Sequence, residues 1–127
     1  MTNKINIGII GCSTIAKNST IDSILKSNNA KLEHIGSRSN DKALEFSKIF
    51  GCKKYGTYDD VINDKNVDVV YISTPVGNHE EWVLKSAKKG KHVLCEKSST
   101  ISFESAKKWL KWLKKIMLEI ECYLNLQ

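Results

Sequence analysis

Several features are absent from the 127-residue sequence, and each absence excludes a class of protein. The chain has no run of about 18 apolar residues, which excludes a membrane-spanning helix. It shows no signal peptide, because the apolar stretch that follows Lys4 is broken at Gly8 and Gly11. We therefore expect a cytoplasmic protein with no membrane partner.

Cysteine motifs are also absent. The four cysteines (Cys12, Cys52, Cys95 and Cys122) lie far apart, without a C-x-x-C pair or a Cys/His cluster at metal-ligand spacing. We expect free thiols and no metal site. Cys12 and Cys95 are interpreted as small packing residues.

Arginine is nearly absent: Arg38 is the only arginine among 20 basic residues. The net charge of +6 therefore comes from lysines, and these are scattered along the chain in pairs such as Lys53–Lys54 and Lys107–Lys108. A nucleic-acid site needs its basic residues clustered on one face. The scattered lysines indicate solvated helix surfaces and no nucleic-acid partner.

What the sequence does contain is an alternation of strand and helix patterns in a length that suits one domain, residues 1–127. Strands are predicted at Ile5–Ile10, Leu32–Gly36, Val67–Ser73, Lys91–Cys95 and Ile116–Cys122. Helices are predicted from Thr14, from a cap at Asn40 to Gly51, over Asp59–Asn63, from a capping box of Asn78 and Glu81 to Gly90, and from Ser102. This order predicts an α/β fold with a doubly wound parallel sheet, which binds ligands at the carboxyl edge of its strands.

The first strand-to-helix turn carries a degenerate G-x-G-x-x-G/A pattern. Gly11 takes the first position and Ala16 the third, while Ser13 replaces the middle glycine. A helix N-terminus offers free N–H groups and a positive dipole end to a pyrophosphate, and the hydroxyls of Ser13 and Thr14 add donors. The alternative is a glycine turn without a ligand. Because the pattern lies in the first strand–helix unit, we favour a dinucleotide.

The second strand ends in Gly36-Ser37-Arg38, where an NAD-specific site would carry Asp or Glu. A planar guanidinium suits a phosphate, and no carboxylate is near to repel one. We therefore expect NADP in preference to NAD. The alternative is an ordinary surface arginine.

Polar residues also follow the third and fourth predicted strands, in the segments VDVVYISTPVGNHEEW and GKHVLCEK. Together with GIIGCSTIA and GSR, these segments resemble the N-terminal domain of the glucose–fructose oxidoreductase/inositol dehydrogenase/MocA family. The resemblance extends over residues 4–115, and the four motifs occur in the family's order and spacing.

The resemblance implies an NAD(P)-dependent oxidoreductase that acts on a sugar, a polyol or a related hydroxyl compound. It implies the following cofactor contacts: Gly11, Ser13, Thr14 and Ile15 at the pyrophosphate, Ser37 and Arg38 at the adenosine ribose, and Thr74, Pro75, Asn78, His79, Glu96 and Lys97 at the nicotinamide side. Lys97 is the candidate that orients the substrate and assists proton transfer. His79 is a second catalytic candidate, with a purely structural role in the first turn of a helix as the alternative.

The chain departs from the family at two points. Ser98 replaces the proline of the Glu-Lys-Pro motif, which removes a constraint on that loop. Family members also continue into a second α/β domain that forms the substrate pocket, whereas residues 116–127 give only a final strand and the start of that domain. We expect cofactor binding with little turnover by this chain alone. The alternatives are a non-catalytic dinucleotide-binding module, one half of a split enzyme and an inactive truncated product.

The last predicted helix carries Trp109 and Trp112 beside its apolar stripe. If these side chains are exposed, they indicate self-association or a partner polypeptide.

Overall fold

The computed structural model describes residues 4–96 together with Glu104, Lys107 and Lys111. Its strands are β1 (Ile5–Ile10), β2 (Ala30–Gly36), β3 (Lys54–Gly56), β4 (Val69–Ile72) and β5 (His92–Cys95). Its helices are α1 (Ile21–Lys26), α2 (Asn40–Phe50), α3 (Tyr58–Asn63) and α4 (His79–Lys88), with a π-helical turn at Ala16–Thr20 and a 3₁₀ turn at Val76–Asn78.

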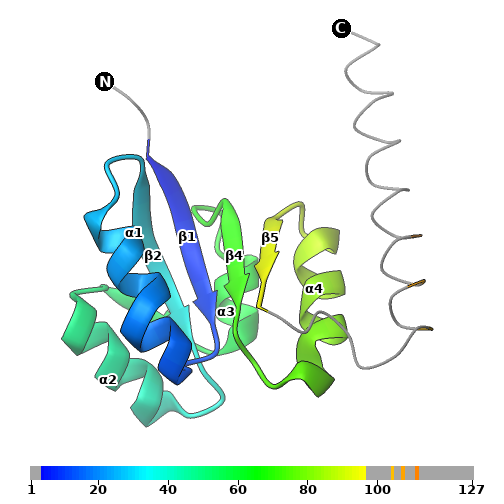
Figure 1. Cartoon of the computed structure of the whole chain (residues 1–127), viewed down its shortest axis with the longest axis horizontal. Helices are drawn as coiled ribbons and strands as arrows, with labels where there is room; N and C mark the ends of the chain where they lie inside the picture. The colour runs from blue at the N-terminus through cyan, green and yellow to red at the C-terminus, as the bar shows by residue number, and fades with distance from the viewer. Residues whose placement is uncertain (1–3, 97–103, 105–106, 108–110, 112–127) are drawn as a thin grey trace, which may run out of the picture.

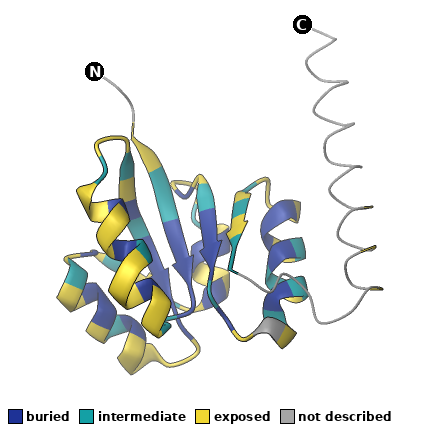
Figure 2. Cartoon of the chain, in the orientation of Figure 1, coloured by how far each residue is buried: buried dark blue, intermediate teal, exposed yellow. Residues whose placement is uncertain are grey.

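All neighbouring strands pair in parallel, in the order β3-β2-β1-β4-β5. Helices α1 and α2 cover one face of this sheet, and α3 and α4 cover the other (Figure 1). Side chains alternate along β1, so Ile9 packs under α1 and α2 while Ile10 packs under α3 and α4, and both are fully buried. The expected doubly wound parallel sheet is confirmed, with its buried residues concentrated in β1, β2, β4 and the inner helix faces (Figure 2).

The strands differ from the predicted ones in four places, of which the smallest is β5, which begins at His92 rather than Lys91. β2 begins two residues earlier than expected, at Ala30, and β4 is shorter than the apolar run Val67–Ser73. Strand β3 was not predicted, because its three residues form no recognisable period. It exists through pairing with β2, in which Lys54 lies opposite His34.

Two predicted helix caps need correction. The N-cap of α2 is Ser39 rather than Asn40, since the Ser39 side chain accepts a hydrogen bond from the Lys42 N–H. At α4 the expected capping box is wrong: Asn78 has helical backbone angles as the last residue of a 3₁₀ turn, and its side chain makes no cap hydrogen bond. A capping side chain requires an extended backbone at the N-cap. Gly51 ends α2 in the left-handed conformation, as expected.

The first helix begins at Thr14, as predicted, but it is not a regular α-helix. Over Ala16–Thr20 it widens into a π turn, in which the Ile21 N–H bonds to the Ala16 carbonyl five residues back. Such turns insert one extra residue and are frequent at functional sites. The sequence pattern gave no indication of it.

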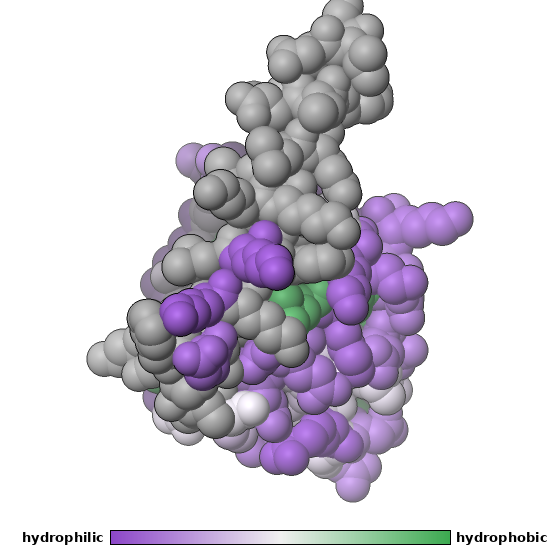
Figure 3. Space-filling view, turned by 90° about the vertical axis from the view of Figure 1, so that its right-hand side faces the viewer, coloured by the Kyte–Doolittle hydropathy of each residue, from purple (hydrophilic) through white to green (hydrophobic). Residues whose placement is uncertain are grey.

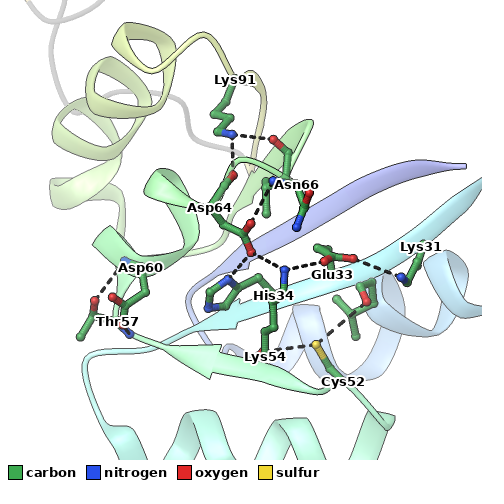
Figure 4. Close-up of polar contacts among 12 residues, drawn as sticks. Lys31, Glu33, His34, Cys52, Lys54, Thr57, Asp60, Asp64, Asn66 and Lys91 are labelled. Atoms are coloured by element: carbon green, nitrogen blue, oxygen red, sulfur yellow. Dashed lines mark hydrogen bonds and ion pairs between the residues drawn. The ribbon is translucent and has the colours of Figure 1, made fainter.

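A polar cluster fastens the loop after α3 to the sheet (Figure 4). The Asp64 carboxylate lies 2.9 Å from His34 Nδ1 and 3.0 Å from Lys54 Nζ, and Lys54 also bonds to Glu33 at 2.8 Å. Lys91, directly before β5, donates to the Asp64 carbonyl at 2.7 Å. The cluster therefore links the short edge strand β3, the α3–β4 loop and β5.

The surface on the β5 and α4 side is mostly hydrophilic (Figure 3). Leu94 of β5 is the most exposed large apolar side chain among the described residues, at 59%. Within the same part of the chain, no helix has the length and apolar character to cross a membrane. The predicted strand Ile116–Cys122 and the residues Trp109 and Trp112 lie outside the described residues, as does the start of the helix predicted from Ser102.

Candidate functional site

The turn after β1 is built around Gly11, which adopts a φ of 101°. A Cβ on this residue would lie 2.9 Å from the Ser73 carbonyl carbon and 3.0 Å from the Thr74 nitrogen. The Gly11 N–H donates to the Gly36 carbonyl at 3.0 Å, and the Ser73 hydroxyl donates to the Gly11 carbonyl at 2.8 Å. The turn is thus held between the ends of β2 and β4, at a separation that only glycine allows.

Ser13, at the middle position of the motif, serves as the cap of the helix that begins at Thr14. Its Oγ accepts a hydrogen bond from the Ala16 N–H at 3.1 Å, and its carbonyl accepts from the Lys17 N–H at 3.0 Å. No described residue other than glycine has a positive φ, so serine fits here without strain. The serine substitution therefore preserves the turn and the helix N-terminus that follows it, whose first N–H groups have no partner within the helix.

A groove of about 390 Å³ runs along the carboxyl ends of β1, β2 and β4, and we call it the carboxyl-edge groove. It is lined by Gly11, Cys12, Ser13, Ser37, Arg38, Ser39, Lys42, Tyr58, Ser73, Thr74 and Pro75. Six of the predicted site residues thus meet in one groove, and no carboxylate is among its described lining residues.

At the β2 end of the groove, Ser37 is buried and Arg38 is exposed. The Ser37 hydroxyl accepts from the Ser39 N–H at 3.2 Å, which fixes the loop that presents the guanidinium. Lys42 and Tyr58 also line this end, and the sequence analysis did not select either of them. Lys42 lies four residues after Arg38, at the start of α2, which could have indicated a second cation.

Tyr58 forms the floor of this end and is 7% exposed. Burial raises the pKa of its hydroxyl, and a hydrogen bond to Arg38 and its charge oppose that rise. Its ring packs edge-on against Trp82 of α4, with 4.9 Å between ring centroids. Arg38 therefore has a fixed neighbour although its side chain reaches solvent.

At the β4 end of the groove, Thr74 is buried and Pro75 is exposed. His79 is 2% exposed and its Nε2 donates to the Thr74 carbonyl at 2.7 Å. The Thr74 hydroxyl is buried without a hydrogen-bond partner among the described residues. A buried hydroxyl of this kind is costly unless a ligand completes it.

Glu96 follows β5 directly, and its N–H donates to the Ile72 carbonyl at 3.0 Å. Its Oε1 accepts a 2.6 Å hydrogen bond from the Tyr71 hydroxyl, which in turn accepts from the Thr20 hydroxyl at 3.1 Å. Burial, followed by the bond to Glu96, raises the pKa of Tyr71 to about 12. Lys97, the next residue, lies outside the described residues.

The cysteines of the described region are free thiols: Cys12, Cys52 and Cys95. Burial raises the pKa of each, and that of Cys95 reaches about 11. Cys12 and Cys95 pack against the two apolar clusters, in agreement with a packing role. The described part of the chain contains no group of three or more His, Cys, Asp or Glu residues arranged to hold a metal ion.

These residues fit a bound dinucleotide on three grounds. The Gly11 backbone turn allows a close approach, a helix N-terminus follows this turn at Thr14, and the Thr74 hydroxyl lacks a partner among the described residues. The strand order 3-2-1-4-5 places this groove where the order reverses, which is the ligand position of open α/β sheets. Fold and site together define a dinucleotide-binding domain of the Rossmann type.

The comparisons with known proteins identify the family. Residues 5–118 match the family model GFO_IDH_MocA, described as an oxidoreductase family with an NAD-binding Rossmann fold. This chain belongs to that family, which confirms the resemblance and the expected nicotinamide dinucleotide cofactor.

Similar proteins include the dTDP-3,4-didehydro-2,6-dideoxy-alpha-D-glucose 3-reductase of Streptomyces violaceoruber, which is 35% identical over 96 residues. That alignment covers 76% of this chain and 28% of the reductase. The D-xylose 1-dehydrogenase (NADP(+)) of Hypocrea jecorina is 37% identical over 82 residues, covering 61% of this chain and 21% of that enzyme.

Among solved structures, the 3-ketoreductase KijD10 of Actinomadura kijaniata in complex with NADP superposes with a TM-score of 0.84 at 30% identity. It covers 89% of this chain and 36% of the reductase. This chain therefore spans about a third, or less, of the length of the relatives described.

Proposed function

We propose that this chain binds NADP(H) as the nucleotide-binding part of an oxidoreductase that transfers hydride to or from a sugar, a polyol or a related hydroxyl compound. The proposal rests mainly on the carboxyl-edge groove, which brings the turn at Gly11 together with Arg38 and Lys42. The sugar-reductase and sugar-dehydrogenase names of the relatives support the substrate class.

The adenosine end of the cofactor is assigned to the β2 end of the groove. An NAD-selective site carries a carboxylate after the second strand, for the ribose 2′-hydroxyl. Here that place holds Ser37 and Arg38, with Lys42 lining the same groove. Two cations without a nearby lining carboxylate favour a 2′-phosphate. The printed names of relatives that use or bind NADP agree with this preference.

The nicotinamide end is assigned to the region beyond β4 and β5, with Thr74, Pro75, Asn78, Glu96 and Lys97 as its contacts. The bound cofactor supplies or accepts the hydride. We assign to the Lys97 Nζ the hydrogen bond that orients the substrate oxygen, and the transfer of its proton. The Thr74 hydroxyl gains a partner when the cofactor is bound.

His79 is assigned a positioning role in this proposal. The His79 ring is only 2% exposed, and its Nε2 is occupied by the hydrogen bond to the Thr74 carbonyl. It holds the Thr74–Pro75 loop against the groove. We therefore favour the structural alternative of the sequence analysis over direct catalysis by His79.

Fluorescence titration of the purified chain with NADPH and with NADH tests the proposal. We expect tighter binding of NADPH, and we expect Arg38→Ala to weaken NADPH about 10- to 100-fold while changing NADH little, as for the loss of a charge-assisted hydrogen bond. Lys48→Ala is the matched control, because Lys48 is an exposed cation in the last turn of α2. Equal or tighter binding of NADH by the wild-type chain would contradict the cofactor assignment.

Catalysis requires a second surface that holds the substrate and excludes water from the nicotinamide end. We propose that this surface comes from outside the residues of this chain, so the chain alone binds cofactor with little turnover. A panel of sugars and polyols, assayed with the chain alone, checks this. Substantial turnover by the chain alone would contradict it.

A further inference from the structure

Two successive side-chain hydrogen bonds connect the first helix to the residue that follows β5. The Thr20 hydroxyl donates to the Tyr71 hydroxyl at 3.1 Å, and the Tyr71 hydroxyl donates to Glu96 Oε1 at 2.6 Å. Tyr71 is 2% exposed and belongs to the apolar cluster under α1 and α2. The Tyr71 side chain is therefore buried among apolar side chains, while its hydroxyl is hydrogen-bonded to Glu96.

Thr20, the first donor of this hydrogen-bond series, lies in the π turn. The wide turn at Ala16–Thr20 inserts one residue into the helix, and one residue corresponds to a rotation of about 100° around a helix axis. The insertion therefore changes the direction of the Thr20 side chain relative to that in a regular α-helix. The residue that bonds to Tyr71 is thus the last residue of the π turn.

Glu96 lies at the nicotinamide end of the site. The adenosine end is at β2 and the pyrophosphate turn follows β1, so an extended dinucleotide continues toward β4 and β5. Cys95 pairs with Ile72, and the Glu96 N–H bonds to the Ile72 carbonyl, next to the Ser73–Thr74 segment of the groove. Glu96 therefore has a fixed backbone as well as a held carboxylate oxygen.

We propose that Thr20 and Tyr71 are positioning residues that hold the Glu96 carboxylate toward the nicotinamide ribose of the cofactor. Oε1 is occupied by Tyr71, and Oε2 has no hydrogen-bond partner among the described residues, so Oε2 accepts from a ribose hydroxyl. Tyr71 stays protonated as the donor because its pKa is raised to about 12. This inference rests on the proposed cofactor function, and it assigns to Thr20 and Tyr71 a role that acts through Glu96.

Two ligands separate the proposal from a general effect on the fold. NADPH spans the whole site, whereas 2′,5′-ADP occupies only the adenosine end. Tyr71→Phe keeps the ring in the core and removes the hydroxyl. We expect it to weaken NADPH about three- to tenfold, as for the loss of one hydrogen bond, and to leave the affinity for 2′,5′-ADP unchanged. Tyr55→Phe is the matched control, since Tyr55 is 40% exposed on β3 and lies outside the carboxyl-edge groove.

Three further variants test whether the effect passes through Glu96. Thr20→Val should weaken NADPH about twofold, because Tyr71 loses only the donor behind it, and Thr20→Ser should restore the wild-type affinity. In a Glu96→Ala background, Tyr71→Phe should produce no additional loss of NADPH affinity. If Tyr71→Phe fails to fold, the Thr20 pair decides the question.

The outcomes are distinguishable. Unchanged NADPH affinity in Tyr71→Phe, or equal losses for NADPH and 2′,5′-ADP, would overturn the positioning role while leaving the cofactor function intact. Thr20→Ser and Thr20→Val behaving alike would also overturn it. A wild-type chain that binds neither ligand would remove the proposed function itself.

Discussion

Gly11→Ala is the substitution for which the structure gives the most definite expectation. The φ of 101° lies outside the left-handed well that a non-glycine residue tolerates, which costs about 1–3 kcal/mol. The new Cβ would also lie within 3.0 Å of the Ser73 and Thr74 backbone, and relieving such overpacking costs about another 1–3 kcal/mol. The total is about 2–6 kcal/mol, a large part of the stability of a domain.

Gly51→Ala is the matched control for this experiment. Gly51 also has a positive φ, of 68°, but a Cβ there would meet no atom within 4 Å. We expect a cost of about 1 kcal/mol, from backbone conformation alone. The difference between the two variants therefore measures how closely the β1 turn approaches the end of β4.

Thermal unfolding and NADPH titration together complete the test. Gly11→Ala should lower Tm by about 8–24 °C, against about 4 °C for Gly51→Ala. It should also weaken NADPH by about tenfold or more at a temperature where both variants are folded, because the turn must move away from β4. If the two variants have the same Tm and the same NADPH affinity, the turn does not require glycine and the reasoning is refuted.

Three further predictions concern the helix cap, the polar cluster and a thiol. Ser13→Ala should lower the free energy of unfolding by about 1 kcal/mol through loss of the cap, whereas Ser13→Gly should lower it by only a few tenths, as measured by urea denaturation. Burial alone would raise the pKa of Asp64, but its bonds to a backbone N–H, His34 and Lys54 lower it to about 2. Asp64→Asn should therefore destabilise the protein by about 1–2 kcal/mol at pH 7, and the difference from wild type should disappear as pH falls from about 4 to about 2; a constant difference would show that Asp64 is not ionised. Cys52 is 7% exposed with a raised pKa, so iodoacetamide at pH 8 should modify it only after unfolding in urea, as peptide mass spectrometry would show.

The sequence predicted the parts of the fold that depend on local pattern. The apolar run of β1 and the glycine that ends α2 lie where they were expected, because periodicity and glycine conformation act within a few residues. Strand β3 was missed because three residues carry no period, and pairing with β2 alone makes them a strand. The Asn78 capping box failed because a preceding 3₁₀ turn fixed the backbone of Asn78 in a helical conformation.

The candidate site divides in the same way. Gly11, Ser13 and Arg38 were found from motif spacing, and the structure brings them into one groove. Lys42 and Tyr58 were not selected, because only the packing of α2 and α3 beside the β2 end shows that they share the groove. The role of His79 depended on burial, which no local pattern reveals.

By itself, the sequence determined the class of this protein: a parallel α/β domain with a dinucleotide turn and a single arginine where a carboxylate would select NAD. These features follow from residue type and local spacing. The tertiary structure alone decided how distant groups meet: the Ser73 backbone against Gly11, the His79 ring against Thr74, and the hydroxyl of Tyr71 between Thr20 and Glu96. Such contacts join residues up to 62 positions apart, and their geometry is set by how the helices pack on the sheet rather than by any local pattern.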